Sequence, residues 1–216
     1  MNSLVMMLIE NIGIIAFAIS GAVVAGRKDM DIFGINILAL VTATGGGLIR
    51  DILINKVPPA MFTNPAYTII ALITANIAFV IMYLKKPMPK KVTPFYDSLL
   101  FWLDTLGLAS FTVDGAFAGI HSQYSDNLFL VAFLGIITGV GGGIIRDVLA
   151  DKIPAILIKH VYAVACIAGA IVIVILWKYT ENELLSSVAG FFTIVIIRFL
   201  AMHFKWNLPT VHLQEK

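Results

Sequence analysis

Apolar residues fill seven long stretches of the chain, and short polar or proline-containing segments separate them. An α-helix of about 20 apolar residues spans the hydrocarbon core of a bilayer, so each stretch predicts one transmembrane helix. The alternation of polar and apolar residues found in the strands of membrane barrels is absent from the sequence, which favours a helical bundle. The predicted spans are residues 4–25, 32–54, 66–84, 99–120, 128–150, 158–177 and 184–204.

Composition excludes an ordinary soluble domain. Of the 216 residues, 59% are hydrophobic and 13% are charged, and the mean hydropathy is +0.94. We therefore expect an all-α membrane protein. No basic segment precedes the first stretch and Glu10 interrupts it, so we expect a retained first span rather than a signal peptide. The single cysteine, Cys166, cannot form an intrachain disulfide.

One motif occurs twice in the chain. The sequence from Gly45 to Asp51 reads GGGLIRD, and the sequence from Gly141 to Asp147 reads GGGIIRD. The similarity extends over 17 positions, 42–58 and 138–154, at a constant offset of 96, and 10 of these positions are identical. A weaker similarity aligns residues 13–22 with 107–116 at an offset of 94, which puts Glu10 opposite Asp104 and Ser20 opposite Asp114.

This duplication predicts two inverted three-helix repeats followed by an unpaired seventh helix. A unit with an odd number of spans reverses its orientation when it is repeated, which gives inverted repeats related by a pseudo-two-fold axis in the membrane plane. The expected units are residues 1–84 for the first repeat, 85–94 for a basic linker, 95–180 for the second repeat, and 181–216 for the seventh helix and tail.

The basic residues predict the orientation of the chain. When loops are assigned to alternate sides, only Arg50, Lys56 and Lys178 of the 15 lysines and arginines fall on one side. The other 12 mark the cytoplasmic side, so the N-terminus is expected outside and the C-terminus in the cytoplasm of a cell membrane. The run from Lys85 to Lys91 is interpreted as a determinant of this topology, or as a site for anionic membrane lipid.

The glycine triplets lie near the middle of two predicted spans, where glycine costs about 1 kcal/mol per residue in a helix. Glycine would let each helix kink or unwind, and the freed carbonyls would suit a partly dehydrated cation. The alternative is that the glycines only allow close helix packing. The candidate residues for a central path, including hydroxyl ligands one turn before each triplet, are Gly45, Gly46, Gly47, Gly141, Gly142, Gly143, Thr42 and Thr138.

Charged side chains inside the predicted spans are the candidates for electrostatic gating. Ionisable residues at this depth are costly and mark functional sites by default, although an arginine also reaches headgroups or caps a helix end. Adjacent residues on a helix do not face each other, so we expect each arginine to find its partner on another span. The candidates are Arg50, Asp51, Arg146, Asp147, Asp114, Asp104 and Glu10, whereas the four histidines show no metal-ligand spacing.

The doubled motif, the six-plus-one spans and the inverted repeat resemble the trimeric intracellular cation channel family, in its prokaryotic branch. They are also similar to the bacterial family of small membrane proteins labelled a glycine transporter. The resemblance covers roughly residues 4–205. It implies a seven-helix protomer, a homotrimer and a cation pore inside each protomer between the kinked second and fifth helices. Residues 48–51 and 144–147 lack the lysine motif through which animal members bind phosphoinositide, which argues against that ligand.

The first functional hypothesis is a passive channel for potassium and sodium, with no cofactor and with no nucleic acid among its partners. Arg50 and Arg146 would act as gates, and Arg146→Ala is expected to raise the open probability. The second hypothesis is a secondary transporter of a small zwitterion such as glycine, because many secondary transporters consist of inverted repeats. An intramembrane enzyme would have to use Asp104 and Asp114, neither of which belongs to a catalytic motif, so we expect no enzymatic activity.

Overall fold

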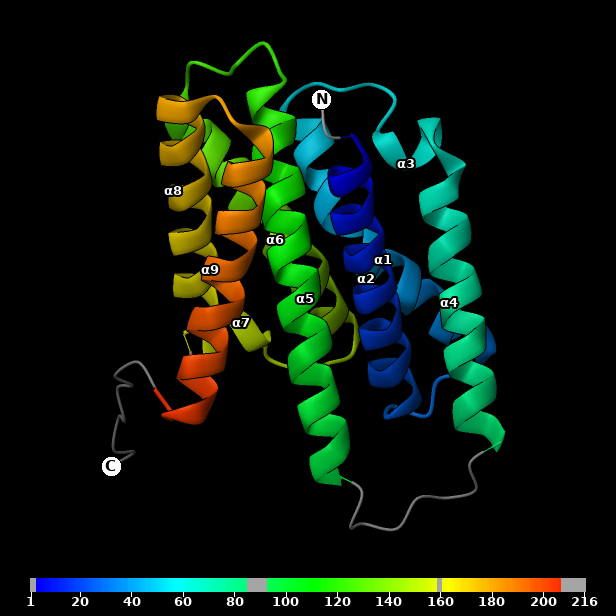
Figure 1. Cartoon of the computed structure of the whole chain (residues 1–216). Helices are drawn as coiled ribbons and strands as arrows, with labels where there is room; N and C mark the ends of the chain where they lie inside the picture. Colours follow the sequence, from blue (N-terminus) through cyan, green and yellow to red (C-terminus); the bar gives the residue numbers. More distant parts are fainter. Residues whose placement is uncertain (1–2, 85–92, 159–160, 207–216) are drawn as a thin grey trace, which may run out of the picture.

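The computed structural model describes residues 3–84, 93–158 and 161–206. Within these ranges every regular element is an α-helix, and the helices stand side by side as a bundle (Figure 1). Seven are long and two are single turns. Their bounds are α1 Ser3–Gly26, α2 Ile32–Leu53, α3 Ala60–Thr63, α4 Pro65–Leu84, α5 Thr93–Ile120, α6 Leu128–Leu149, α7 Ala155–Ile158, α8 Tyr162–Thr180 and α9 Glu183–His203.

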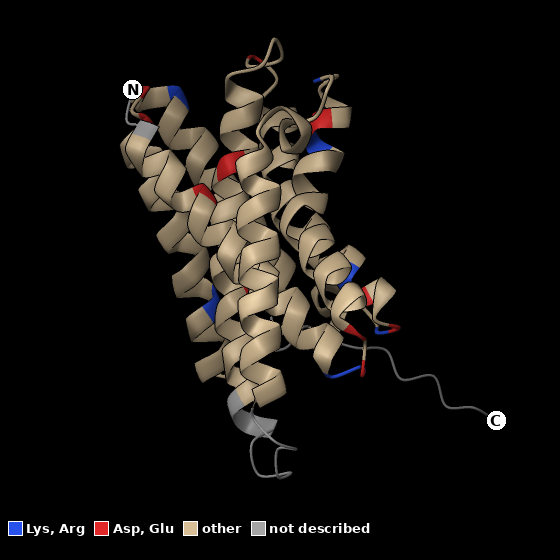
Figure 2. Ribbon diagram, turned by 90° about the vertical axis from the view of Figure 1, so that its right-hand side faces the viewer, with Lys and Arg blue, Asp and Glu red and all other residues tan. Residues whose placement is uncertain are grey.

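Six of the described helices are long and apolar enough to cross a membrane, and the molecule is an all-helical membrane protein. They are α1, α2, α4, α6, α8 and α9. The predicted fourth span lies inside α5, a 28-residue helix that also carries three aspartates. Figure 2 shows that most of the ribbon carries no charge and that only a few charged residues lie in its middle.

The predicted span limits agree with the helices to within a few residues, with two corrections. The sixth span was expected to begin at residue 158, but α8 begins at Tyr162. The segments after α2 and α6, where no helix was predicted, each contain a short helix. A proline directly precedes each short helix, Pro59 before α3 and Pro154 before α7, and proline favours the first turn of a helix. The basic run 85–91 and the tail 207–216 lie outside the described residues.

Six of the seven long helices form two groups of three. Helices α1, α2 and α4 pack against one another around a core that includes Ala18, Ala39 and Ala75, all with no exposed surface. Helices α5, α6 and α8 form the second group, and α9 packs on α5 and α8. The two groups meet where α2 crosses α6 and where α1 lies along α5. The short helices lie toward opposite ends of the bundle, α3 at the end that holds the N-terminus and α7 at the other (Figure 1).

The two groups also begin and end their central helices in the same way. Asp31 caps α2 by accepting a hydrogen bond from the Gly34 amide at 2.8 Å, and Asn127 caps α6 from Leu130 at 3.0 Å. Just past the C-terminal ends, Asn55 and Asp151 both have a left-handed backbone, with φ of 55° and 51°. Asparagine and aspartate tolerate this conformation better than other residues with side chains.

Candidate functional site

The glycine triplets lie where α2 crosses α6. A Cβ atom on Gly46 would collide with the carbonyl oxygen of Thr138, and one on Gly142 would collide with the carbonyl oxygen of Thr42. A Cβ on Gly141 would come within 3.0 Å of the Gly46 Cα. The two backbones therefore touch, and only glycine allows so close an approach.

Both helices continue through the triplets without a break. The expected unwinding, with carbonyls freed for a cation, is not present in this structure. The main-chain hydrogen bonds of both helices persist through the triplets, and Gly46, Gly141 and Gly142 face the backbone of the neighbouring helix instead of solvent. The packing interpretation accounts for Gly46, Gly141 and Gly142, and a role of the six glycines in a cation path stays a prediction.

The two threonines before the triplets are buried at the same crossing, each with 1% of its surface exposed. The hydroxyl of Thr42 donates to the carbonyl of Leu38 at 2.5 Å, and that of Thr138 donates to the carbonyl of Leu134 at 2.6 Å. Each hydroxyl proton is thus used within its own helix. Each threonine also lies against a glycine of a neighbouring helix, Thr42 against Gly21 and Thr138 against Gly115.

The arginine and aspartate of each motif bind each other. Arg50 Nε donates to Asp51 Oδ1 at 2.9 Å, and Arg146 Nε donates to Asp147 Oδ1 at 2.9 Å. The expectation that neighbouring residues on a helix would not meet is therefore wrong here, because the long arginine side chain curls back toward the next residue. All four side chains are buried, with 1–5% of each residue exposed. The two arginines therefore expose almost no surface to lipid headgroups.

Each aspartate also caps the short helix that follows. The second carboxylate oxygen of Asp51 accepts from the Ala60 amide at 2.7 Å, at the start of α3. That of Asp147 accepts from the Ala155 amide at 2.8 Å, at the start of α7. A carboxylate at a helix N-terminus satisfies an unpaired amide and interacts favourably with the helix dipole. The motif thus ties the end of a long helix to the next segment of chain.

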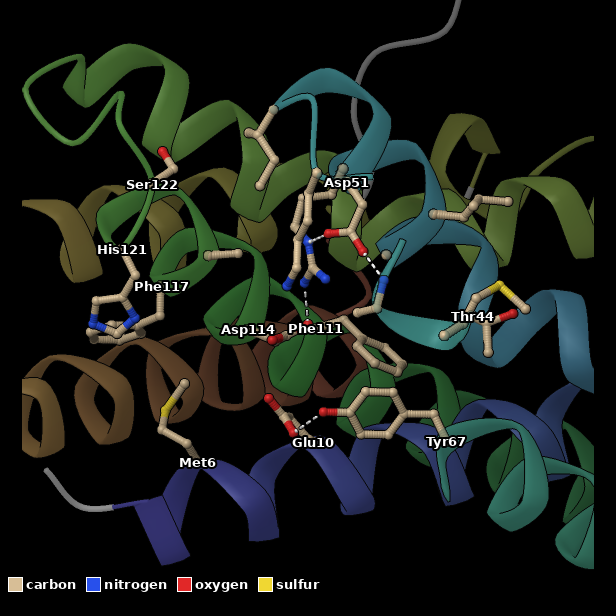
Figure 3. A pocket seen from close by; sticks show the side chains of 18 of the residues that line it. Met6, Glu10, Thr44, Asp51, Tyr67, Phe111, Asp114, Phe117, His121 and Ser122 are labelled. Carbon is tan, nitrogen blue, oxygen red and sulfur yellow. Dashed lines mark hydrogen bonds and ion pairs between the residues drawn. The ribbon is translucent and has the colours of Figure 1, made fainter. Parts of the chain in front are cut away.

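We call the surroundings of Arg50 the first arginine site. Arg50 Nη1 donates to Asp114 of α5 at 2.5 Å. Glu10 of α1 lies beside Asp114 (Figure 3) and accepts a hydrogen bond from the Tyr67 hydroxyl of α4 at 3.0 Å. One arginine therefore faces three carboxylates, those of Asp51, Asp114 and Glu10, and the site carries a formal excess of negative charge.

The second arginine site surrounds Arg146. Its Nη1 donates to Asp104 of α5 at 2.5 Å and to the Ser20 hydroxyl of α1 at 2.5 Å. Ser20 in turn donates to Asp104 at 2.7 Å. Arg198 of α9 is also buried nearby, with 3% of its surface exposed, and its Nε donates to Thr105 at 3.3 Å. Two arginines thus accompany two carboxylates, so the formal charges balance.

The two sites differ in the space beside them. The first borders a cavity of about 860 Å³ that reaches from the glycine triplet to the α5–α6 loop. Its lining includes Gly47, Arg50 and Asp114, together with His121 and Ser122 of the α5–α6 loop (Figure 3). The second has no space for a water molecule between its lining residues, which include Gly143, Arg146 and Tyr162.

The structure brings together the charged residues that the sequence singled out, in two separate sets. Asp114, Glu10 and Asp51 gather at Arg50, and Asp104 and Asp147 gather at Arg146. The partners on other spans were expected. Four participants were missed as site residues: Ser20, Tyr67, Tyr162 and Arg198. The repeat alignment already put Ser20 opposite Asp114, and the offset between Tyr67 and Tyr162, 95, is close to that of the motif.

Comparison with known families matches the same two parts of the chain. A family model described as glycine transporter matches residues 7–83 and residues 101–178. The UPF0126 inner membrane protein YadS of Escherichia coli K12 is 37% identical over 96% of both chains. The UPF0126 membrane protein YvgT of Bacillus subtilis is 37% identical over 94% of both chains.

Solved structures resemble the whole fold. A chain from a study of the structural basis for conductance through TRIC cation channels superposes with a TM-score of 0.83 and 34% identity, over 97% of this chain and 98% of that one. The TRIC trimeric intracellular cation channel orthologue from Rhodobacter sphaeroides superposes with a TM-score of 0.81 and 32% identity, over 94% and 99%. A prokaryotic TRIC channel crystallised in 0.5 M KCl gives 0.82 and 31%, over 95% and 99%.

Proposed function

The chain belongs to the family of the prokaryotic trimeric intracellular cation channels, and from this membership we propose that it is a passive channel for monovalent cations. The observation that carries the proposal is the cavity at the first arginine site. Carboxylates outnumber arginine there by three to one, deep inside a helical membrane protein. The cavity lining also includes Lys56 and Glu183, so its carboxylates outnumber its lysine and arginine side chains by four to two. A cavity with low-dielectric walls and a net excess of negative charge concentrates cations.

We further propose seven membrane spans, arranged as two inverted three-helix repeats and a seventh helix. Several observations support this architecture. The family model matches one segment in each three-helix group. Arg50 and Arg146 make matching bonds to the next residue and to the next short helix. The short helices α3 and α7 lie toward opposite ends of the bundle (Figure 1), as an inverted pair would.

The proposed path runs inside the protomer between α2 and α6. It enters through the cavity at the first arginine site, passes the crossing of the glycine triplets and leaves beside the second arginine site. The backbones touch at the crossing and the second site is filled, so the described conformation corresponds to a closed channel. Conduction requires the two helices to separate at the triplets, where glycine offers little side-chain obstruction.

We propose an inner or plasma membrane location, with the first arginine site facing outside and the second facing the cytoplasm. The distribution of basic residues supports this orientation. We also propose a homotrimer with a path in each protomer, because a similar solved structure is described as a trimeric channel. Potassium and sodium are the proposed permeant ions.

The deciding experiment is single-channel recording of the purified protein in a planar bilayer under asymmetric potassium chloride. Discrete currents that reverse near the potassium equilibrium potential are expected. A matched variant, Asp97→Asn, removes an exposed carboxylate on α5 that pairs with Arg27 outside the cavity and is expected to conduct normally. A silent bilayer, together with saturable uptake of radiolabelled glycine by liposomes from the same preparation, would contradict the channel proposal and favour a transporter.

A further inference from the structure

Two tyrosines occupy corresponding positions beside the two arginine sites but lie in different surroundings. Tyr67 near the start of α4 lines the open cavity, is partly exposed and donates its hydroxyl to Glu10. Tyr162 at the start of α8 is 4% exposed and lines the filled second site. Its hydroxyl oxygen lies 3.6 Å from the position of a Cβ on Gly143, the third glycine of the second triplet. Tyr162 therefore occupies space that the corresponding tyrosine leaves open.

The seventh long helix supplies the difference between the two sites. The guanidinium carbon of Arg198 in α9 lies 4.4 Å from the centre of the Tyr162 ring and 4.6 Å from that of Phe101. Its Nε also donates to Thr105. Cations attract aromatic faces at these distances, and more strongly when water is excluded. Helix α9 packs on α5 and α8, and the described contacts include no helix that covers α4 in the same way.

Arg198 is an unusual residue for its surroundings. It lies within an apolar stretch of α9, residues 194–202, and no described carboxylate forms a direct ion pair with it. A buried cation is costly in this environment, whereas an aliphatic side chain would pack there without that cost. The contacts of Arg198 with two aromatic rings and a hydroxyl therefore indicate a role in positioning these groups, since protein stability alone would favour an aliphatic residue.

We propose that Tyr162 closes the path at the second arginine site and that Arg198 is the positioning residue that keeps its ring there. This inference rests on the proposed path through the protomer. Release of the ring from Arg198 would let Tyr162 turn aside, as Tyr67 does at the first site, and would open a second cavity next to Gly143. Helix α9 then holds Tyr162 in place at the second arginine site, and no described helix covers Tyr67 in the same way at the first.

Thiol accessibility tests this inference without any measurement of ion flux. In a Cys166→Ala background, Val140→Cys reports on the second site, whose lining includes Val140, and Thr44→Cys reports on the open cavity. The probe is the trimethylammonium-ethyl methanethiosulfonate reagent, applied to the full-length protein in liposomes. Four variants are compared, Tyr162→Ala, Tyr162→Phe, Arg198→Gln and Arg198→Lys.

We expect Tyr162→Ala and Arg198→Gln to raise the modification rate of the Val140 reporter at least about tenfold, the effect of about 1.4 kcal/mol on a rate. Tyr162→Phe, which keeps the ring, and Arg198→Lys, which keeps the charge, should stay near the background rate. The Thr44 reporter should react equally in all variants.

An unchanged Val140 reporter in Tyr162→Ala would overturn the closing role of Tyr162, and an unchanged one in Arg198→Gln would overturn the positioning role of Arg198. Faster modification at both reporters would mean general loosening of the bundle and would overturn both roles. If only the Val140 reporter responds but no variant carries potassium current, the closure stands and the proposed channel function fails. The two proposals can therefore fail separately.

Discussion

At the scale of single residues, neighbouring glycines of one triplet have different surroundings. Gly46 faces the backbone of α6, whereas a Cβ on Gly47 would meet only the Arg50 guanidinium, at 3.6 Å, an ordinary contact distance. Glycine in a helix is unfavourable by about 1 kcal/mol relative to alanine unless close packing requires it. The same substitution should therefore have opposite effects at adjacent positions.

We expect Gly46→Ala to lower the free energy of unfolding by about 1–3 kcal/mol, because the new methyl group forces the helices apart. Gly47→Ala is the matched control and should leave stability equal or raise it by up to about 1 kcal/mol. Denaturation of the purified protein in detergent measures both. Equal stability of the two variants would mean that the helices do not cross where the structure has them.

Arg146 illustrates how one residue serves both packing and gating. It binds Asp104, Ser20 and Asp147 at the filled end of the proposed path. Removal of its positive charge should favour cations, so Arg146→Ala is expected to raise potassium flux roughly tenfold, the effect of about 1.4 kcal/mol on a rate. Flux into liposomes measures it.

A control variant separates the effect of losing the Arg146 charge from the effect of losing protein stability. Arg146→Ala leaves Asp104 buried without its main partner, a change that costs about 3–5 kcal/mol. Arg146→Ala combined with Asp104→Asn removes both charges and should restore stability while keeping the raised flux. A flux that falls in both variants would contradict a gating role for Arg146.

At the scale of helices, the sequence predicts the long elements well because each contains enough apolar residues to span a bilayer. It does not predict α3 and α7, whose four residues are too few to give a periodic signal. These helices depend instead on a tertiary bond, from the motif aspartate to the first helical amide. The arginine–aspartate bond was missed for a related reason, since helix geometry constrains Cβ positions more than the end of a long side chain.

The bond between Asp51 and the Ala60 amide gives a prediction about α3. Asp51→Ala removes both the cap and a partner of Arg50, so we expect a loss of about 1–2 kcal/mol and faster amide exchange within α3. Amide hydrogen exchange followed by mass spectrometry measures this, with α7 as the internal reference. Uniform exchange in α3 and α7 would show that the cap does not order the segment.

At the scale of the molecule, the excess of carboxylates lies at one end of the proposed path. Glu10 belongs to this excess without binding Arg50 directly, because its hydrogen-bond partner is Tyr67. Glu10→Gln preserves a side chain that accepts from Tyr67 while removing one negative charge. We expect it to reduce potassium conductance in about 0.01 M salt, and the loss should shrink toward 1 M salt, where the Debye length falls from about 30 to about 3 Å. Loss of conductance that is independent of salt would contradict this electrostatic role.

The orientation of the molecule in the membrane is predicted from its basic residues and can be tested directly. The basic residues predict that the α6–α7 loop faces the cytoplasm and the α5–α6 loop faces outside. In a Cys166→Ala background, Gln123→Cys and Ile153→Cys each place one thiol at an exposed position in these loops. In intact cells, a membrane-impermeant maleimide should label Gln123→Cys, whereas Ile153→Cys should be labelled only after permeabilisation. The reverse pattern would turn the carboxylate-rich cavity toward the cytoplasm and make Tyr162 an outer closure. Both arginine sites would then keep their geometry, because it depends on contacts within the bundle and not on its direction in the membrane.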